Sequence, residues 1–339
     1  GAQFLPAYLG ALLVLAAVTG LYLRRRRPAW EPRAFAGFFL AFFLFYAPAA
    51  TLYALWILFV CFSLGRLLLS RLAEDTLEQW TLYPAAGLGL LSALLFVLGL
   101  AGLYYKLVIL ILLAAATVAF RRNGPRLWDL WRRAERAYAA SASAPLCGLC
   151  LVFVFVSTLT SAMVALSPEI AFDPVSFHFV YSRQWALGHG LAANPRFPYS
   201  YFPQNVEILY TLSFLLDGQA LAKVLNYAFF PLAALSLVLL GRCWVSTAGG
   251  LVGAALFVTT PFISWTGSVA KNDLALALYL LLALHAVLRW IEGQRFGWLA
   301  AATLFLGFGF GGKHVAVLGA VPLGALVLGH WRGSRLGPR

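Results

Sequence analysis

The sequence predicts an all-α polytopic integral membrane protein, and three observations support this fold class. Of the 339 residues, 62% are hydrophobic and only 11% are charged, whereas soluble domains carry about 25% charged residues. The mean hydropathy is +0.83. The apolar residues form runs that approach the length of a membrane helix, about 20 residues. These runs are apolar on all sides, whereas the strands of a membrane barrel would alternate apolar and polar residues.

About eleven hydrophobic helices are expected along the chain. The first five lie within residues 1–140, and they are 4–23, 34–47, 51–70, 82–103 and 107–120. The other six lie within residues 141–339, and they are 145–166, 220–241, 248–266, 274–291, 297–312 and 314–330. The last two form a predicted hairpin, 297–330. The longest polar connection is the loop 167–219, which is rich in aromatic residues and proline, so we expect it to pack against the helices.

The net charge of +13 is unevenly placed along the chain. Most of the arginines fall in alternate connections, including residues 24–27, 121–136 and 289–295. Cytoplasmic loops of membrane proteins are enriched in Lys and Arg, so these connections are predicted to be cytoplasmic. The loop 167–219 is then predicted to lie outside. The membrane topology accounts for the positive charge, and no nucleic-acid partner is expected.

One glycine-rich stretch resembles a nucleotide-binding motif but stands in the wrong context. The run GFGFGGKH (residues 307–314) fits the glycines of a dinucleotide fingerprint and most of a phosphate-binding loop. Both motifs require a preceding strand and a following helix, whereas here both flanks are apolar helices. Lys313 remains, between two apolar runs, and a lysine at membrane depth indicates a functional site with a partner nearby.

Charged residues gather at one predicted membrane face. Asp173 lies in the polar stretch SPEIAFDPVSFHFVYSRQWALGHG (residues 167–190), and the run KND supplies Lys271 and Asp273. The alternation of helices brings all three to the same face, near Lys313. Acids and bases together suit chemistry on an anionic lipid headgroup. The structural alternatives are that Asp273 caps the following helix and that Lys271 is an interfacial anchor.

Four sequence blocks carry a resemblance to a known superfamily. They are FDPVSFHFVYSRQWALGHG, YSYFPQNVEILY, GSVAKNDLALALYLLLAL and LFLGFGFGGKHVAVLGAVPLGALVL. In their order and spacing they resemble the GT-C glycosyltransferases that use polyprenyl-phosphate sugars, such as protein O-mannosyltransferases and lipid A aminoarabinose transferases. The resemblance covers about residues 145–330. It implies a GT-C-like core in 141–339, additional N-terminal helices in 1–140, and a C-terminal part of the family fold that is absent from this chain.

The resemblance also implies roles for individual residues. Asp173 matches the acid that acts as the catalytic base, and Asp273 matches a second acid that helps to bind a divalent metal in some relatives. If a metal, Mg or Mn, is bound, Asp173 and Asp273 would be its ligands. Lys271, Lys313 and Arg183 would bind the donor phosphate. The implied contacts to the sugar are His178, Tyr199, Tyr201, Gln204 and Glu207. A structural histidine and interfacial tyrosines are the alternatives for His178 and the two tyrosines.

The function expected from these features is transfer of a sugar from a polyprenyl-phosphate donor to an acceptor, with inversion. By the same resemblance the protein would lie in the bacterial inner membrane with its active face outside the cytoplasm, in contact with lipid. Two alternatives remain open: a non-catalytic GT-C-derived subunit of a larger membrane complex, and a transporter. The transporter is less favoured because the charges gather at one face, whereas transporter sites lie in broken helices at the midplane.

Overall fold

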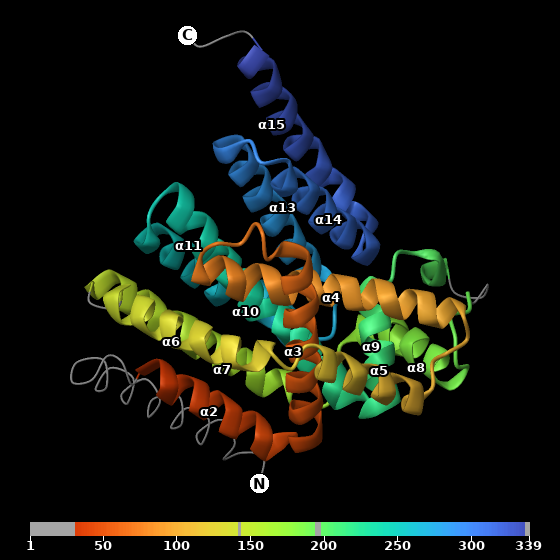
Figure 1. The fold of residues 1–339 in the computed structure, drawn as a ribbon. Helices are drawn as coiled ribbons and strands as arrows, with labels where there is room; N and C mark the ends of the chain where they lie inside the picture. The colour runs from red at the N-terminus through yellow and green to blue at the C-terminus, as the bar shows by residue number, and fades with distance from the viewer. Residues whose placement is uncertain (1–30, 142–143, 194–197, 336–339) are drawn as a thin grey trace.

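The computed structural model describes residues 31–141, 144–193 and 198–335, which form helices and connections but no strand. The α-helices in this part of the chain are α2 (Glu31–Tyr46), α3 (Pro48–Leu69), α4 (Thr76–Leu100), α5 (Lys106–Ala119), α6 (Asn123–Ser141), α7 (Pro145–Ala165), α8 (Phe179–Leu187), α9 (Asn205–Leu216), α10 (Gln219–Trp244), α11 (Thr247–Thr259), α12 (Pro261–Ser268), α13 (Asp273–Gly293), α14 (Phe296–Gly312) and α15 (Val317–Arg335) (Figure 1). A π-helical turn, η2 (Pro174–His178), and two 3₁₀ turns, η3 (Pro198–Tyr201) and η4 (His314–Ala316), complete them. The all-α fold class is confirmed.

The expected number of eleven hydrophobic helices is not confirmed as a number of membrane spans. Within the described residues, six helices are long and apolar enough to cross a membrane, or eight if two bent helix pairs each count as one span. Segment 4–23 lies outside the described residues. Segment 248–266 is not one straight helix, because α11 and α12 meet at an angle of 71°. The break falls at Thr260, where the following Pro261 disfavours the helical conformation and ψ is 118°.

The loop 167–219 is far more regular than an open loop. It contains α8, α9 and the turn η2, and α9 is buried along most of its length. Helix α9 packs against α4, α8 and α10. The expectation that this segment packs against the helices is therefore confirmed for its helical parts, α8 and α9.

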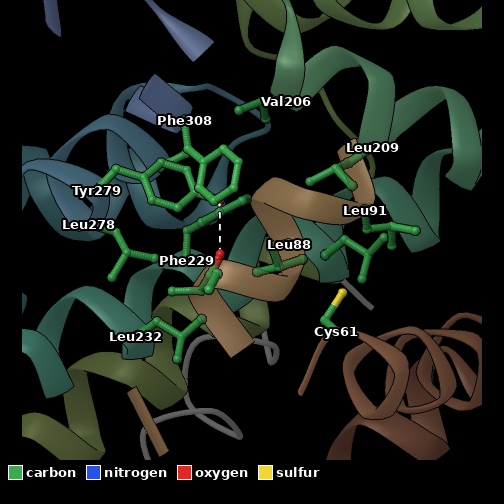
Figure 2. Packing of buried hydrophobic residues seen from close by; sticks show 14 of the residues in the cluster. Cys61, Leu88, Leu91, Val206, Leu209, Phe229, Leu232, Leu278, Tyr279 and Phe308 are labelled. Carbon is green, nitrogen blue, oxygen red and sulfur yellow. Dashed lines mark hydrogen bonds between the residues drawn. The ribbon is translucent and has the colours of Figure 1, made fainter. Parts of the chain in front are cut away.

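The core forms where α4, α10, α13 and α14 meet (Figure 2). Tyr279 of α13 lies against Phe308 of α14 with ring centroids 5.6 Å apart, and its hydroxyl donates to the carbonyl of Ala85 at 3.2 Å. Phe229 of α10 and Leu88 of α4 are fully buried beside them. The N-terminal helix α4 thus shares one core with helices from the C-terminal half of the chain.

Glycines allow α3 and α4 to pack in backbone contact. A Cβ atom built on Gly65 would lie 1.9 Å from the carbonyl oxygen of Tyr83, and one on Gly87 would lie 1.7 Å from that of Cys61. No side chain fits at either position. Small residues at such contacts are typical of membrane helices, where close approach gives van der Waals contact that the lipid would otherwise supply.

One end of the molecule, here called the arginine face, brings together the connections at residues 70–75, 120–123, 242–246 and 293–295. Asp75 caps α4 by accepting from the backbone N–H of Leu77 at 2.7 Å, and its second oxygen pairs with Arg242. Arg295 donates to Glu74 at 2.5 Å. These contacts show that the connections carrying Asp75, Arg242 and Arg295 share one end. Residues 24–27 lie outside the described residues, and the assignment of this end to the cytoplasm stays a prediction.

The opposite end, here called the site face, holds residues 101–106, 166–193, 198–205, 216–218, 269–273 and 311–316. The backbone N–H of Tyr104 donates to the carbonyl of His189, and that of Leu191 donates to the carbonyl of Gly99, both at 3.0 Å. Lys106 donates to the carbonyl of Leu216 at 3.0 Å. The long loop is therefore tied to the α4–α5 turn, so the N-terminal helices form one wall of the site face.

Helix α15 extends away from the other helices (Figure 1). Only 6% of the apolar 18-residue stretch within His314–Arg332, which includes most of α15, is buried. The corresponding stretch of α10 is 67% buried. The apolar surface of α15 therefore faces outward, as expected of a helix in contact with lipid or with further protein. The predicted hairpin 297–330 is present as α14 and α15, joined by Lys313 and η4.

Candidate functional site

Asp173 directly precedes the π-helical turn η2 on the site face. Such turns are rare and are frequent at functional sites. The Asp173 carboxylate forms an ion pair with Lys271, whose ammonium also lies over the ring of Trp265, 4.8 Å from its centroid. The Asp173 side chain is 36% exposed and that of Lys271 15%, so the carboxylate can be reached from outside while the lysine is largely enclosed.

Lys313 and Asp273 form a second ion pair beside the first. The ammonium of Lys313 lies 2.5 Å from Oδ1 of Asp273, and both side chains are about one-third exposed, at 34% and 38%. The structure thus places Lys313 against an acid of the site face, as the sequence analysis expects. Asp273 lies in the first turn of α13, where a negative charge is favourable, and the N-cap position is held by Asn272, whose side chain makes no capping hydrogen bond.

His178 and Glu207 lie behind these ion pairs and contact each other. Nδ1 of His178 lies 2.6 Å from Oε1 of Glu207, and both side chains are buried. Asn272 donates to the same carboxylate oxygen at 3.4 Å and to the carbonyl of Gly312 at 3.0 Å. Both predicted sugar contacts are therefore engaged within the protein, and Asn272, which the sequence analysis did not select, links them to the end of α14.

The three consecutive residues of the run KND reach three separate parts of the sequence. Lys271 contacts Asp173, Asn272 contacts Glu207, and Asp273 contacts Lys313. Backbone geometry explains this, since Asn272 and Asp273 turn into α13 while Lys271 still lies in the extended connection after α12. A single turn therefore assembles the four charged residues that the sequence analysis placed on one face.

A buried ion pair that the sequence analysis did not predict supports this turn. Lys223 of α10 lies 3.6 Å from Oε2 of Glu169, and their side chains are 3% and 1% exposed. Lys223 also donates to the carbonyls of Val164 and Ser167 at the end of α7, and Glu169 accepts from the backbone N–H of Ala270 at 2.9 Å. The pair thus joins the connection that carries Asp173 to the one that carries Lys271.

The other predicted site residues lie at the edge of this arrangement. Tyr199 and Tyr201 are 50% and 65% exposed, and Tyr199 stacks on Phe177 with centroids 5.0 Å apart. Gln204 donates to the carbonyl of Tyr199 at 2.7 Å. Arg183 is exposed on α8 and forms no ion pair among the described residues. The structure therefore brings Arg183 to no other member of the predicted set.

A pocket of about 400 Å³ opens beside Gln204 on the same face. Its walls are mainly apolar and include Phe96 and Leu100 of α4, Trp185 of α8, and Phe310 of α14. Phe202 and Gly311 also contribute to the lining. The Phe202 ring lies 5.2 Å from that of His314, the residue next to Lys313. An apolar cavity therefore adjoins the charged cluster.

The carboxylates of this site do not fit a bound divalent metal as they stand. Asp173 and Asp273 each direct one carboxylate oxygen to a lysine ammonium, and a positive charge so close to each carboxylate disfavours a second cation there. Among the described residues, no group of three or more His, Cys, Asp and Glu side chains is placed to hold a metal ion. We therefore derive no step through a metal and assign the neutralising charge at the site to the lysines.

Comparison with known families agrees with the resemblance seen in the sequence. The sequence model of the dolichyl-phosphate-mannose-protein mannosyltransferase family matches residues 208–337. This family is of the GT-C type, so the resemblance to GT-C glycosyltransferases is confirmed for this part of the chain. The matched region contains Lys271, Asp273 and Lys313, while Asp173 and the loop as far as Glu207 precede it. No curated protein sequence and no solved structure matches the chain.

The fold and the family match together define a class of protein. The chain is a multi-pass α-helical membrane protein whose C-terminal part is similar to glycosyltransferases of the GT-C type.

Proposed function

We propose that this chain transfers a sugar from a polyprenyl-phosphate donor to an acceptor hydroxyl at the site face, outside the cytoplasm. The observation that carries this proposal is the turn at residues 271–273, which joins two lysines and two accessible carboxylates in one cluster. The similarity of residues 208–337 to a mannosyltransferase family supports the reaction class.

In the proposed reaction Asp173 is the general base. It accepts the proton of the acceptor hydroxyl, whose oxygen forms a bond to the anomeric carbon as the bond from that carbon to the phosphate oxygen breaks. Attack from the face opposite the leaving group inverts the anomeric configuration. The departing polyprenyl phosphate gains negative charge, which Lys271 and Lys313 neutralise, and such preorganised charge often supplies the largest part of a rate enhancement.

The ion pair between Asp173 and Lys271 gives this reaction an order of events. While the two are paired, the carboxylate is engaged and the base is not free. A donor phosphate that binds Lys271 would draw the ammonium away and release Asp173 to accept a proton. The neighbouring apolar pocket, lined by Phe96, Leu100 and Phe310, suits isoprenoid units of the same donor, because burial of apolar surface is favourable there.

The test is turnover of Asp173→Asn in the full-length protein, with a panel of labelled polyprenyl-phosphate sugars. Asn keeps the size of the side chain but cannot act as a base, so transfer should fall by about 10²- to 10⁴-fold. The melting temperature should change little, because the Asp173 side chain is partly exposed and the amide oxygen of Asn can still accept a hydrogen bond from Lys271. Asp217→Asn is the matched control, since Asp217 is an exposed acid of the same face outside the cluster.

The alternative is a non-catalytic subunit of a larger membrane complex, and the same experiment separates the two functions. Unchanged turnover in Asp173→Asn, or no turnover of any donor by the unaltered protein, would favour the subunit. The transporter has less support, because the four charged residues lie in connections and helix ends at one face and not in broken helices at the midplane.

A further inference from the structure

A polar cavity lies at the arginine face, at the opposite end of the bundle from Asp173. Its volume is about 270 Å³, and it opens between α3, α4 and α6. Its lining includes three arginines, Arg66 of α3 and Arg126 and Arg133 of α6, together with Tyr83 of α4 and the apolar side chains of Phe62 and Leu130. No carboxylate contributes to this lining. The cavity therefore presents positive charge and hydrogen-bond donors to whatever enters it.

The three guanidinium groups have little negative charge to balance them. Arg66 and Arg126 both donate to the same neutral acceptor, Oδ1 of Asn123, at 3.1 and 3.4 Å. Arg133 forms no ion pair or side-chain hydrogen bond within the described part of the chain. Asp129, the nearest acid along α6, is exposed and pairs with none of them among the described residues. Three like charges around one cavity repel each other, and an anion between them would remove that cost.

The sequence of α6 is arranged to build this cavity wall. Arg126, Leu130 and Arg133 are spaced at i, i+4 and i+7, so they lie on one face of the helix. Asn123, which orients two of the arginines, is the first residue of α6. The helix N-terminus adds positive potential there. Leu130 is 2% exposed and packs into the bundle, which holds the arginines on either side of it at the cavity.

The surroundings of the cavity point to a lipid. Leu67 and Leu68, which directly follow Arg66, are 67% and 43% exposed. Trp128 on α6 is 53% exposed, and the guanidinium of Arg132 lies 5.2 Å from its ring centroid. Exposed leucines on a membrane helix face acyl chains, while Trp and Arg are typical of the interface. The cavity thus lies where headgroup and acyl chains meet.

We infer that this cavity binds the phosphate group of an anionic phospholipid, with Arg66, Arg126 and Arg133 as its ligands. Guanidinium groups bind phosphate oxygens through strong, often bidentate hydrogen bonds, and basic pockets between membrane helices are suited to lipid headgroups. The site is separate from the proposed sugar transfer and does not depend on it. Occupancy would fasten α6 to the ends of α3 and α4.

The experiment uses the delipidated full-length protein in neutral detergent, titrated with phosphatidylglycerol or with phosphatidylcholine of the same acyl chains. We expect phosphatidylglycerol to raise the melting temperature in a saturable way, since a ligand that binds only the folded state stabilises it. Phosphatidylcholine should give at least tenfold weaker apparent binding. Inorganic phosphate at millimolar concentration should have no effect. Equal protection by inorganic phosphate would mean that the site takes a free anion, and equal protection by both lipids would overturn the proposal.

Two triple variants test the residues. Arg66→Gln, Arg126→Gln and Arg133→Gln together should weaken phosphatidylglycerol binding at least tenfold. Arg121→Gln, Arg132→Gln and Arg136→Gln remove the same charge from the same face without touching the cavity, and they should change binding less than twofold. Equal losses in both variants would mean nonspecific attraction to the face. If the first variant does not fold, Arg133→Gln alone should still weaken binding about threefold, and an unchanged affinity would contradict the proposal.

Discussion

Glu207 lies at the centre of the buried polar residues behind the site, and its two carboxylate oxygens differ. Oε1 accepts from Asn272 and contacts His178, whereas Oε2 is buried without a hydrogen-bond partner in the described part of the chain. A buried acceptor that is left unsatisfied costs about 1–3 kcal/mol. Glu207 therefore keeps its position through its contacts with His178 and Asn272, and these contacts hold the turn before α13.

We predict that Glu207→Gln lowers the melting temperature, because the amide loses the charge that faces His178 and brings a second donor into a buried place. The loss of stability should be about 1–3 kcal/mol, and KM for the donor should change less than threefold. Thermal unfolding and donor kinetics measured on the same preparation check this. Glu292→Gln, at a 56% exposed side chain of the arginine face, should be neutral. A raised KM with unchanged stability would instead make Glu207 a sugar contact.

At the level of single residues, the sequence could predict the charged cluster but not its supports. Asp173, Lys271, Asp273 and Lys313 could be found because a charge is costly in so apolar a chain. Asn272 could not, since an amide between two charged residues has no comparable signal. Glu169 and Lys223 are 54 positions apart, and only the fold shows that they meet.

The buried pair of Glu169 and Lys223 acts at the scale of whole elements, because it connects α7, α10 and the turn before α13. We predict that Glu169→Gln or Lys223→Met alone costs about 3–5 kcal/mol, since each leaves a buried charge unpaired. The double variant should cost less than the sum of the two. Thermal unfolding of the four proteins completes the cycle. Additive losses would show that the two side chains act independently and would contradict this link.

Helix type and approximate position could be predicted for most elements, whereas the breaks could not. Segments 51–70 and 145–166 agree closely with α3 and α7. The run 248–266 appears continuous by hydropathy. Pro261 explains where the helix breaks, but the angle of 71° between α11 and α12 is known only from the fold. The helices α8 and α9 within the long loop were not expected either, because their polar residues find partners only after folding, as Ser182 does at Glu207.

At the scale of the whole molecule, the two ends of the bundle carry different charged groups. The site face carries accessible carboxylates paired with lysines, and the arginine face carries arginines of which some pair with acids and three surround a cavity. Helices α4, α10 and α13 run between the two faces, so the relative placement of the faces is fixed by the bundle. Which of the two faces lies in the cytoplasm is inferred only from the enrichment of Lys and Arg in cytoplasmic loops.

The orientation of the two faces can be tested in intact cells by labelling introduced cysteines with a membrane-impermeant maleimide. Cys61, Cys147 and Cys150 are buried, so Cys243→Ser removes the one exposed thiol among the cysteines. In this background Asp217→Cys reports the site face and Asp129→Cys reports the arginine face, and both positions are exposed. Because arginine-rich loops stay in the cytoplasm, Asp217→Cys should react in intact cells and Asp129→Cys only after permeabilisation. The reverse pattern would place Asp173 on the cytoplasmic side and would contradict the proposed transfer to an acceptor outside the cytoplasm.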